Sequence, residues 1–310
     1  STTTDDNRAL GEVLPTTTWL PAPDDLRHLT AGWNGMLFGI SGGGLRPSEA
    51  YVPYAYPLQY EILPPAAKAV ALGVFGQALL VLTTGRPLLV SGSSPDSLDQ
   101  QPLEMPQACI APRSVASMGA GVAWASNDGL CWYGQGGARI LTAGILTREQ
   151  WLALNPSSMI GCMVEGLYFG SYDDGGGRKS FMIDPINPTG VYFIDTGFTA
   201  MHFDELQDQL YVLTGTRVQR WDAASTYMTT VARSKEFRLS RPEGLGWLEV
   251  TADAYPVTVR VDCMNLPAGE VTKLTTIDPR LTAPTPTSIR YTATVASREP
   301  APLPAGWMAD

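Results

Sequence analysis

Residues 78–90 read ALLVLTTGRPLLV, two aliphatic runs separated by a Thr-Thr-Gly turn. This pattern predicts a β-hairpin whose strands are buried on both faces. Similar hairpins are predicted after Gly35, Gly121, Gly166 and Gln209. The first apolar residue of each copy is taken as a landmark, and spacings of 43, 43, 45 and 43 residues separate Met36, Leu79, Val122, Leu167 and Leu210. The hairpin is therefore a repeating unit.

The repeat has a turn glycine in each copy, usually beside Asp, Asn or Thr, where we expect a hairpin turn to need positive φ. These predicted turn glycines are Gly43, Gly85, Gly129, Gly176 and Gly215. A repeat of about 40–45 residues built from paired short strands is typical of a β-propeller blade. A helical repeat would require apolar residues at i, i+3 and i+4, and these segments lack that pattern.

The predicted fold is all-β: a β-propeller with five visible blades of ~43 residues, and a further blade outside the 310 residues would make six. Residues 1–30 are expected to form an extended N-terminal segment and residues 31–230 the propeller. Beyond residue 230 the repeat gives way to alternating apolar and polar residues, which predicts a small antiparallel β-sandwich over 231–310. We expect that domain to be incomplete at its C-terminus. One short helix is predicted at 147–154, where Thr147 and Gln150 form a capping box.

Composition restricts the function. The net charge of −9 argues against a groove that neutralises nucleic-acid phosphates, although DNA could pass along an acidic wall without binding. Only 16% of the residues are charged, which favours burial of surface against other subunits. The four cysteines are scattered without a CxxC spacing and are interpreted as buried, reduced thiols.

Motifs for catalysis are weak throughout. Gly39-Ile40-Ser41-Gly42-Gly43 matches GxSxG, but the residues that follow it cannot form the helix that a nucleophile elbow requires. The turns at Ser126–Gly129 and Ser171–Gly175 resemble the Asp box of sialidases, in which the carboxylate caps turn amides. We therefore predict no catalytic residue, no metal ligand and no cofactor site, and expect no small-molecule substrate.

An aromatic segment follows the first predicted hairpin. Four tyrosines fall within ten residues: Tyr51, Tyr54, Tyr56 and Tyr60. They are candidates for a ligand platform or a subunit interface, because aromatic residues are enriched at interfaces. The favoured interpretation is that they pack the blade edge and a gap between blades.

Several segments carry a resemblance to a family of virion structural proteins of tailed phages and prophages. These segments are residues 13–29, 34–45, 48–57, 73–98, 106–130, 146–159, 253–261 and 297–307. They include NGMLFGISGGGL and LTREQWLALNPSSM, and they span nearly the whole chain. One departure is Tyr54-Ala55-Tyr56-Pro57, where the family has His-Ala-Trp-Pro.

The resemblance implies an architecture similar to the nozzle, or tail tubular, proteins of short-tailed phages. Copies of the chain, six by this analogy, would form a ring that contacts the portal, the adaptor and other tail proteins, and DNA would pass without specific binding. The chain would be made in the bacterial host cytoplasm and located in the virion. Two alternatives are a propeller enzyme or lectin that acts on host-surface glycans, and a host propeller that serves as a protein-interaction platform.

Overall fold

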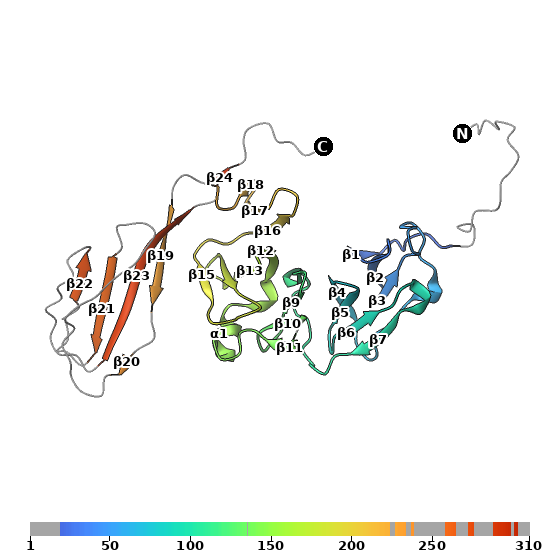
Figure 1. Cartoon of the computed structure of the whole chain (residues 1–310), viewed down its shortest axis with the longest axis horizontal. Helices are drawn as coiled ribbons and strands as arrows, with labels where there is room; N and C mark the ends of the chain where they lie inside the picture. The colour runs from blue at the N-terminus through green and yellow to red at the C-terminus, as the bar shows by residue number, and fades with distance from the viewer. Residues whose placement is uncertain are drawn as a thin grey trace, which may run out of the picture. The chain divides into compact units, whose positions relative to one another are not determined.

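The computed structural model describes residues 19–134 and 136–223 with their side chains. Beyond residue 223 it describes the backbone of six strands at 227–233, 237–238, 258–264, 272–275, 288–298 and 301–302. The chain divides into two compact units, Ser1–Arg217 and Val218–Asp310 (Figure 1). The first strand begins at Arg27, within the segment predicted as extended. The predicted domain limits at 30 and 230 stay predictions.

The first unit is built from antiparallel sheets that follow one another along the chain (Figure 1). The first sheet has three strands, β1 (Arg27–Ala31), β2 (Leu37–Ser41) and β3 (Gly44–Pro47). The second has four, β4 (Ala69–Phe75), β5 (Ala78–Thr83), β6 (Leu88–Ser91) and β7 (Asp99–Pro102). The third consists of β8 (Ala116–Ser117), β9 (Gly121–Ala125), β10 (Leu130–Gly134) and β11 (Gly137–Ile140).

The same arrangement continues to the end of the unit. The fourth sheet consists of β12 (Ile160–Val164), β13 (Leu167–Asp173), β14 (Arg178–Ile183) and β15 (Tyr192–Ile194). A fifth begins with the hairpin of β16 (Ala200–Asp204) and β17 (Gln209–Thr214). In each complete sheet the strands pair in chain order, which is the meander of a propeller blade. The fold is therefore the predicted all-β propeller with five blades.

Packing between blades explains why the second strand of a blade is apolar on both faces. Leu79 and Val81 of β5 belong to a buried cluster with the first blade, whereas Leu80 and Leu82 belong to a cluster with the third blade. Successive side chains of a strand point to opposite faces, so a blade between two others buries both. The hydrophobic core is thus a series of layers between neighbouring blades.

The third and fourth blades repeat this packing. Val122 of β9 faces the second blade, and Ala123 faces the fourth. On β13, Tyr168 lies in the cluster shared with the third blade, while the Phe169 ring stacks on Phe198 just before β16, with ring centroids 6.1 Å apart. Each blade is therefore held mainly by its neighbours in sequence.

The predicted helix is confirmed as α1 (Arg148–Ala153), inserted between the third and fourth blades. Its capping box is present, because the Gln150 amide donates to Thr147 Oγ1 at 3.2 Å and the Thr147 amide donates to Gln150 Oε1 at 2.8 Å. Trp151 is buried in the core between these blades, and its indole N–H donates to the Ser126 carbonyl at 2.8 Å.

The second unit contains a separate antiparallel sheet. Its strands are β19 (Tyr227–Arg233), β20 (Phe237–Arg238), β21 (Thr258–Met264), β22 (Thr272–Thr275) and β23 (Ser288–Arg298). The order is β19-β23-β21-β22, with β20 also paired to β23. The third strand of the fifth sheet is β18 (Arg217–Arg220), which starts at the last residue of the first unit and pairs with β24 (Ala301–Pro302). A sandwich requires a second layer, so the predicted β-sandwich stays a prediction.

Candidate functional site

The repeat landmarks lie in the second strand of each blade, or next to it. Leu79, Val122 and Leu210 are buried in β5, β9 and β17. Met36 is also fully buried, but it precedes β2. It lies two residues before Phe38 and so points to the same side, toward the second blade, whereas Leu79 points toward the first blade, which precedes its own. A shift of one residue moves a side chain to the opposite face of a strand.

Leu167 shows the same one-residue offset. It is only half-buried, and the next residue, Tyr168, takes the position toward the preceding blade that Val122 has in the third blade. The wider spacing of 45 residues falls between Val122 and Leu167, the interval that contains α1. The landmarks at 36 and 167 are therefore one residue out of structural register.

The five predicted turn glycines all lie between the second and third strands of a blade. Gly43, Gly129 and Gly215 have φ of +90°, +155° and +60°, as predicted. Gly85 and Gly176 do not have positive φ, so that part of the prediction is wrong. At Gly85 a threonine makes the turn instead, because Thr83 Oγ1 accepts from the Gly85 amide at 3.0 Å and donates to the Arg86 carbonyl at 2.9 Å. At 173–178 the positive φ values belong to Gly175 and Gly177.

The tyrosine segment separates into two pairs. Tyr51 and Tyr54 are 75% and 64% exposed. Tyr56 is buried, and Tyr60 is half-buried with its hydroxyl donating to Glu49 Oε2 at 3.1 Å. The structure therefore does not bring the four rings together as one platform, and only the first pair is available for an interface.

The carboxylates of the Asp-box-like turn at Ser171–Gly175 are engaged within the fold. Asp173 Oδ1 accepts from the Gly175 amide at 3.0 Å, and Asp174 Oδ1 accepts from the Gly176 amide at 2.9 Å. The Lys179 ammonium lies 2.7 Å from Asp174 Oδ2 and, with the turn amide, lowers the pKa of that carboxyl. Among the described residues no group of His, Cys, Asp or Glu has the arrangement of a metal site.

Three cysteines of the described blades are free thiols inside the propeller. Burial raises the pKa of Cys109, Cys131 and Cys162 to about 12. A thiol with so high a pKa carries almost no thiolate near neutral pH and is a poor nucleophile. These residues act as small core side chains.

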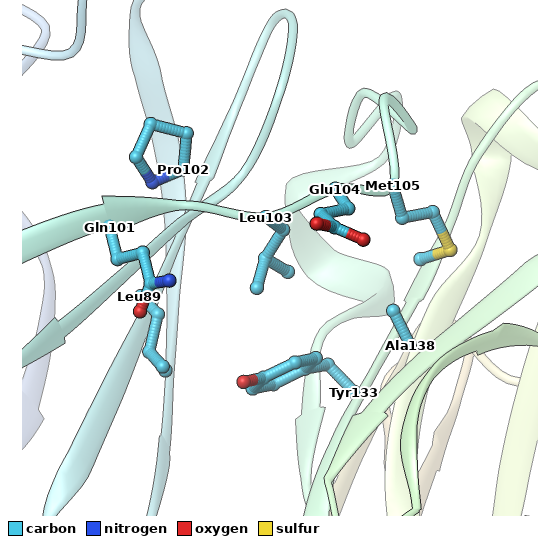
Figure 2. A pocket seen from close by; sticks show the side chains of 8 residues that line it. All are labelled: Leu89, Gln101, Pro102, Leu103, Glu104, Met105, Tyr133 and Ala138. Atoms are coloured by element: carbon cyan, nitrogen blue, oxygen red, sulfur yellow. The ribbon is translucent and has the colours of Figure 1, made fainter.

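A pocket of about 440 Å³ lies between the second and third blades (Figure 2). One side is the cross-strand pair Leu89 and Gln101 of β6 and β7, and the other is the pair Tyr133 and Ala138 of β10 and β11. The first part of the connection between the blades, residues 103–107, is called the linker here. It crosses the top of the view; Leu103 points down from it toward Tyr133, and Glu104 and Met105 lie close beneath it. We call this the linker pocket.

Hydrogen bonds at both ends hold the linker in place. The Leu103 amide donates to the Pro87 carbonyl at 2.9 Å. The Gln107 side chain donates to Asp128 Oδ2 at 2.9 Å, and the Arg148 guanidinium donates to Asp128 Oδ1, also at 2.9 Å. The Gln107 hydrogen bond and the Arg148 charge lower the pKa of Asp128, so this carboxylate stays ionised and keeps both contacts. The linker is thus fixed relative to the helix and to the third blade.

Sequence reasoning missed the linker pocket, because its wall comes from three separate segments. The region 99–106 has the composition of a loop between blades, and nothing in its order indicates which residues face Tyr133. The sequence indicates the pocket only through the alternation of side chains along β10 and β11, which places Tyr133 and Ala138 on one face of the sheet once the strand register is known.

Comparisons with known proteins identify no family. No family model matches the chain, and no curated protein matches it. Among solved structures, the WD40 domain of Toxoplasma gondii coronin aligns with a TM-score of 0.42 and 11% identity, covering 88% of this chain and 70% of that one. The AfRom2 CNH domain aligns with a TM-score of 0.36 and 7% identity, covering 87% of this chain and 80% of the other.

A third solved structure is PorZ, a bacterial surface component of the type IX secretion system of Porphyromonas gingivalis. Its TM-score is 0.35 with 14% identity, and the alignment covers 64% of this chain and 27% of that protein. These low scores carry no functional argument, and the blade assignment depends on the strand order described above. Within the described residues no helix has the length and apolar character to cross a membrane.

Proposed function

We propose that this chain is a structural component of a bacteriophage tail, part of the nozzle or hub ring near the portal and adaptor. The observation that carries the proposal is the resemblance to tailed-phage virion proteins in segments spread from residue 13 to residue 307. In the proposed assembly, copies of the chain form a ring, six by analogy, and DNA passes through without specific binding. The net charge of −9 suits a wall that repels phosphates.

The outer strands of the blades differ in a way that supports an assembly role. Outer strand β7 reads Asp-Gln-Gln-Pro and is exposed throughout, and charges and proline on an edge strand discourage pairing with other chains. Outer strand β15 reads Tyr-Phe-Ile, and Tyr192 and Phe193 are 69% and 50% exposed. Exposed aromatic residues on an edge without a charge or proline are typical of a surface that another subunit covers.

The proposal is tested on virions and on the recombinant chain. Electron microscopy and mass spectrometry of purified particles are expected to place the protein in the tail, and native mass spectrometry of the recombinant chain is expected to show an oligomer. Tyr192→Asp should weaken the oligomer, because it puts a charge on the β15 edge. Leu206→Asp, at a 98% exposed turn position, is the matched control. A strictly monomeric protein that is absent from virions contradicts the proposal.

The glycan-binding enzyme or lectin remains an alternative that no specific contact favours. Its candidate carboxylates, Asp173 and Asp174, already accept hydrogen bonds from their own turns. A glycan array together with a hydrolysis assay tests it, with Asp173→Ala as the control variant. Binding or turnover that Asp173→Ala removes would support this alternative over the tail role.

A further inference from the structure

The linker pocket contains one charged group in an otherwise uncharged wall. Of the described residues that line it, Glu104 is the only one with a carboxylate, and no basic residue lines the pocket. No hydrogen bond or ion pair joins the Glu104 carboxylate to another residue of the described chain. Figure 2 shows this side chain close beneath the linker, between Leu103 and Met105. An exposed carboxylate without a partner, beside a pocket with no basic residue, has the charge that attracts a cation.

The rest of the wall suits a cation attached to an apolar stem. The Tyr133 ring is half-buried and is held edge-to-face by Phe75, with ring centroids 5.6 Å apart. Tyr133 and its small cross-strand neighbour Ala138 both line the pocket. Leu103 and Met105 line the side next to Glu104. An aromatic face attracts a guanidinium or ammonium group, and aliphatic side chains pack against a methylene stem.

We propose that the linker pocket binds an arginine side chain presented by a partner protein. The guanidinium would lie between the Glu104 carboxylate and the Tyr133 ring, with its methylenes against Leu103 and Met105. Arginine fits better than lysine because a planar guanidinium stacks on an aromatic ring while it pairs with a carboxylate. This inference goes beyond the proposed tail function and does not depend on it.

The position of the pocket favours a protein over a free organic cation. One wall of the pocket is β11, which is the outer strand of its sheet and pairs on one side only. Its other edge has backbone amides and carbonyls that a polypeptide can pair with and a small cation cannot. A partner segment that carries an arginine can therefore use both the pocket and a strand edge.

Methyl NMR of the full chain, with ¹³C-labelled methionine, measures binding at Met105, whose signal Met105→Leu identifies. The probes are the peptide Gly-Gly-Arg-Gly-Gly, the same peptide with citrulline in place of arginine, and n-butylguanidinium. The arginine peptide is expected to shift the Met105 signal with a lower Kd than either other probe. Citrulline has nearly the same shape without the charge, so equal binding of that peptide overturns the role of Glu104. Equal binding of n-butylguanidinium overturns the assignment to a protein partner.

Variants locate the binding. Glu104→Gln should weaken the arginine peptide about threefold to fivefold, as expected for loss of one exposed ion pair. Ala138→Leu should abolish binding because the larger side chain fills the space over Tyr133. Glu149→Gln removes an exposed carboxylate on α1 and is the matched control for net charge. Each variant is first shown by thermal unfolding to be folded. No shift with any probe, or full binding by Glu104→Gln and Ala138→Leu, refutes the proposal.

Discussion

Gly73 lies against the next blade, so an added methyl group there tests how the blades pack. A Cβ built on Gly73 of β4 would lie 2.4 Å from Val122 Cγ1 and 2.8 Å from Val122 Cγ2. Val122 is fully buried in β9 of the next blade, so neither methyl can move into solvent. Overpacking of this kind costs about 1–3 kcal/mol. We therefore expect Gly73→Ala to lower the free energy of unfolding by about that amount.

Val122→Ala removes the two methyl groups that the new Cβ would meet. Alone it should cost about 1–3 kcal/mol, because it leaves a small cavity between the blades. In the double variant the added methyl occupies part of that cavity. The combined loss should then be smaller than the sum of the single losses by about 1–2 kcal/mol, a coupling typical of residues in direct contact.

Urea unfolding followed by tryptophan fluorescence measures the four proteins of this cycle. Trp124 and Trp132 lie in the third blade, so the signal reports on the blades concerned. Gly190→Ala is the matched control, since nothing lies within 4 Å of a Cβ at that position and its φ is not positive. Additive losses to within about 0.5 kcal/mol would refute the packing of β4 against β9.

Three further predictions follow from buried groups and turns. In a Cys263→Ser background, Cys109, Cys131 and Cys162 should resist a thiol reagent at pH 8 until the protein is unfolded, and rapid labelling of the native protein would contradict this. Because their pKa is raised to about 12 in the folded protein, the free energy of unfolding should fall as pH rises from about 9 to about 12. Tyr168→Phe should cost about 1–3 kcal/mol in chemical unfolding, because the buried hydroxyl donates to the Ser114 carbonyl at 2.8 Å, whereas Tyr51→Phe at an exposed site should cost little. Gly43→Ala, at φ +90°, should lower the unfolding midpoint through about 1–2 kcal/mol of strain, and Gly85→Ala, without positive φ, should change it little; equal effects would show that φ does not distinguish the two turns.

The repeat was predictable because packing between blades requires a recognisable pattern of apolar residues in the sequence. A second strand buried on both faces needs an unbroken apolar run, and Leu79–Leu82 is such a run. The position of the hairpin turns was also predictable, since all five glycines lie between second and third strands. The backbone conformation of the turns was less predictable, because at Gly85 the Thr83 hydroxyl forms the turn's hydrogen bonds and no positive φ is needed.

The blade toward which each strand residue points, and the linker pocket, both depend on contacts between segments that are distant in the sequence. Met36 and Leu79 look equivalent as the first apolar residues of two copies, yet they face in opposite directions along the series of blades, because strand side chains alternate and a one-residue offset reverses them. The pocket requires the register that sets Tyr133 beside Ala138 and the linker that carries Glu104 over them. The sequence by itself determined that the chain folds as blades, since local apolar runs and turns repeat along it. Only the tertiary structure decided which side chains meet between those blades, since that depends on strand register and on the packing of one sheet against the next.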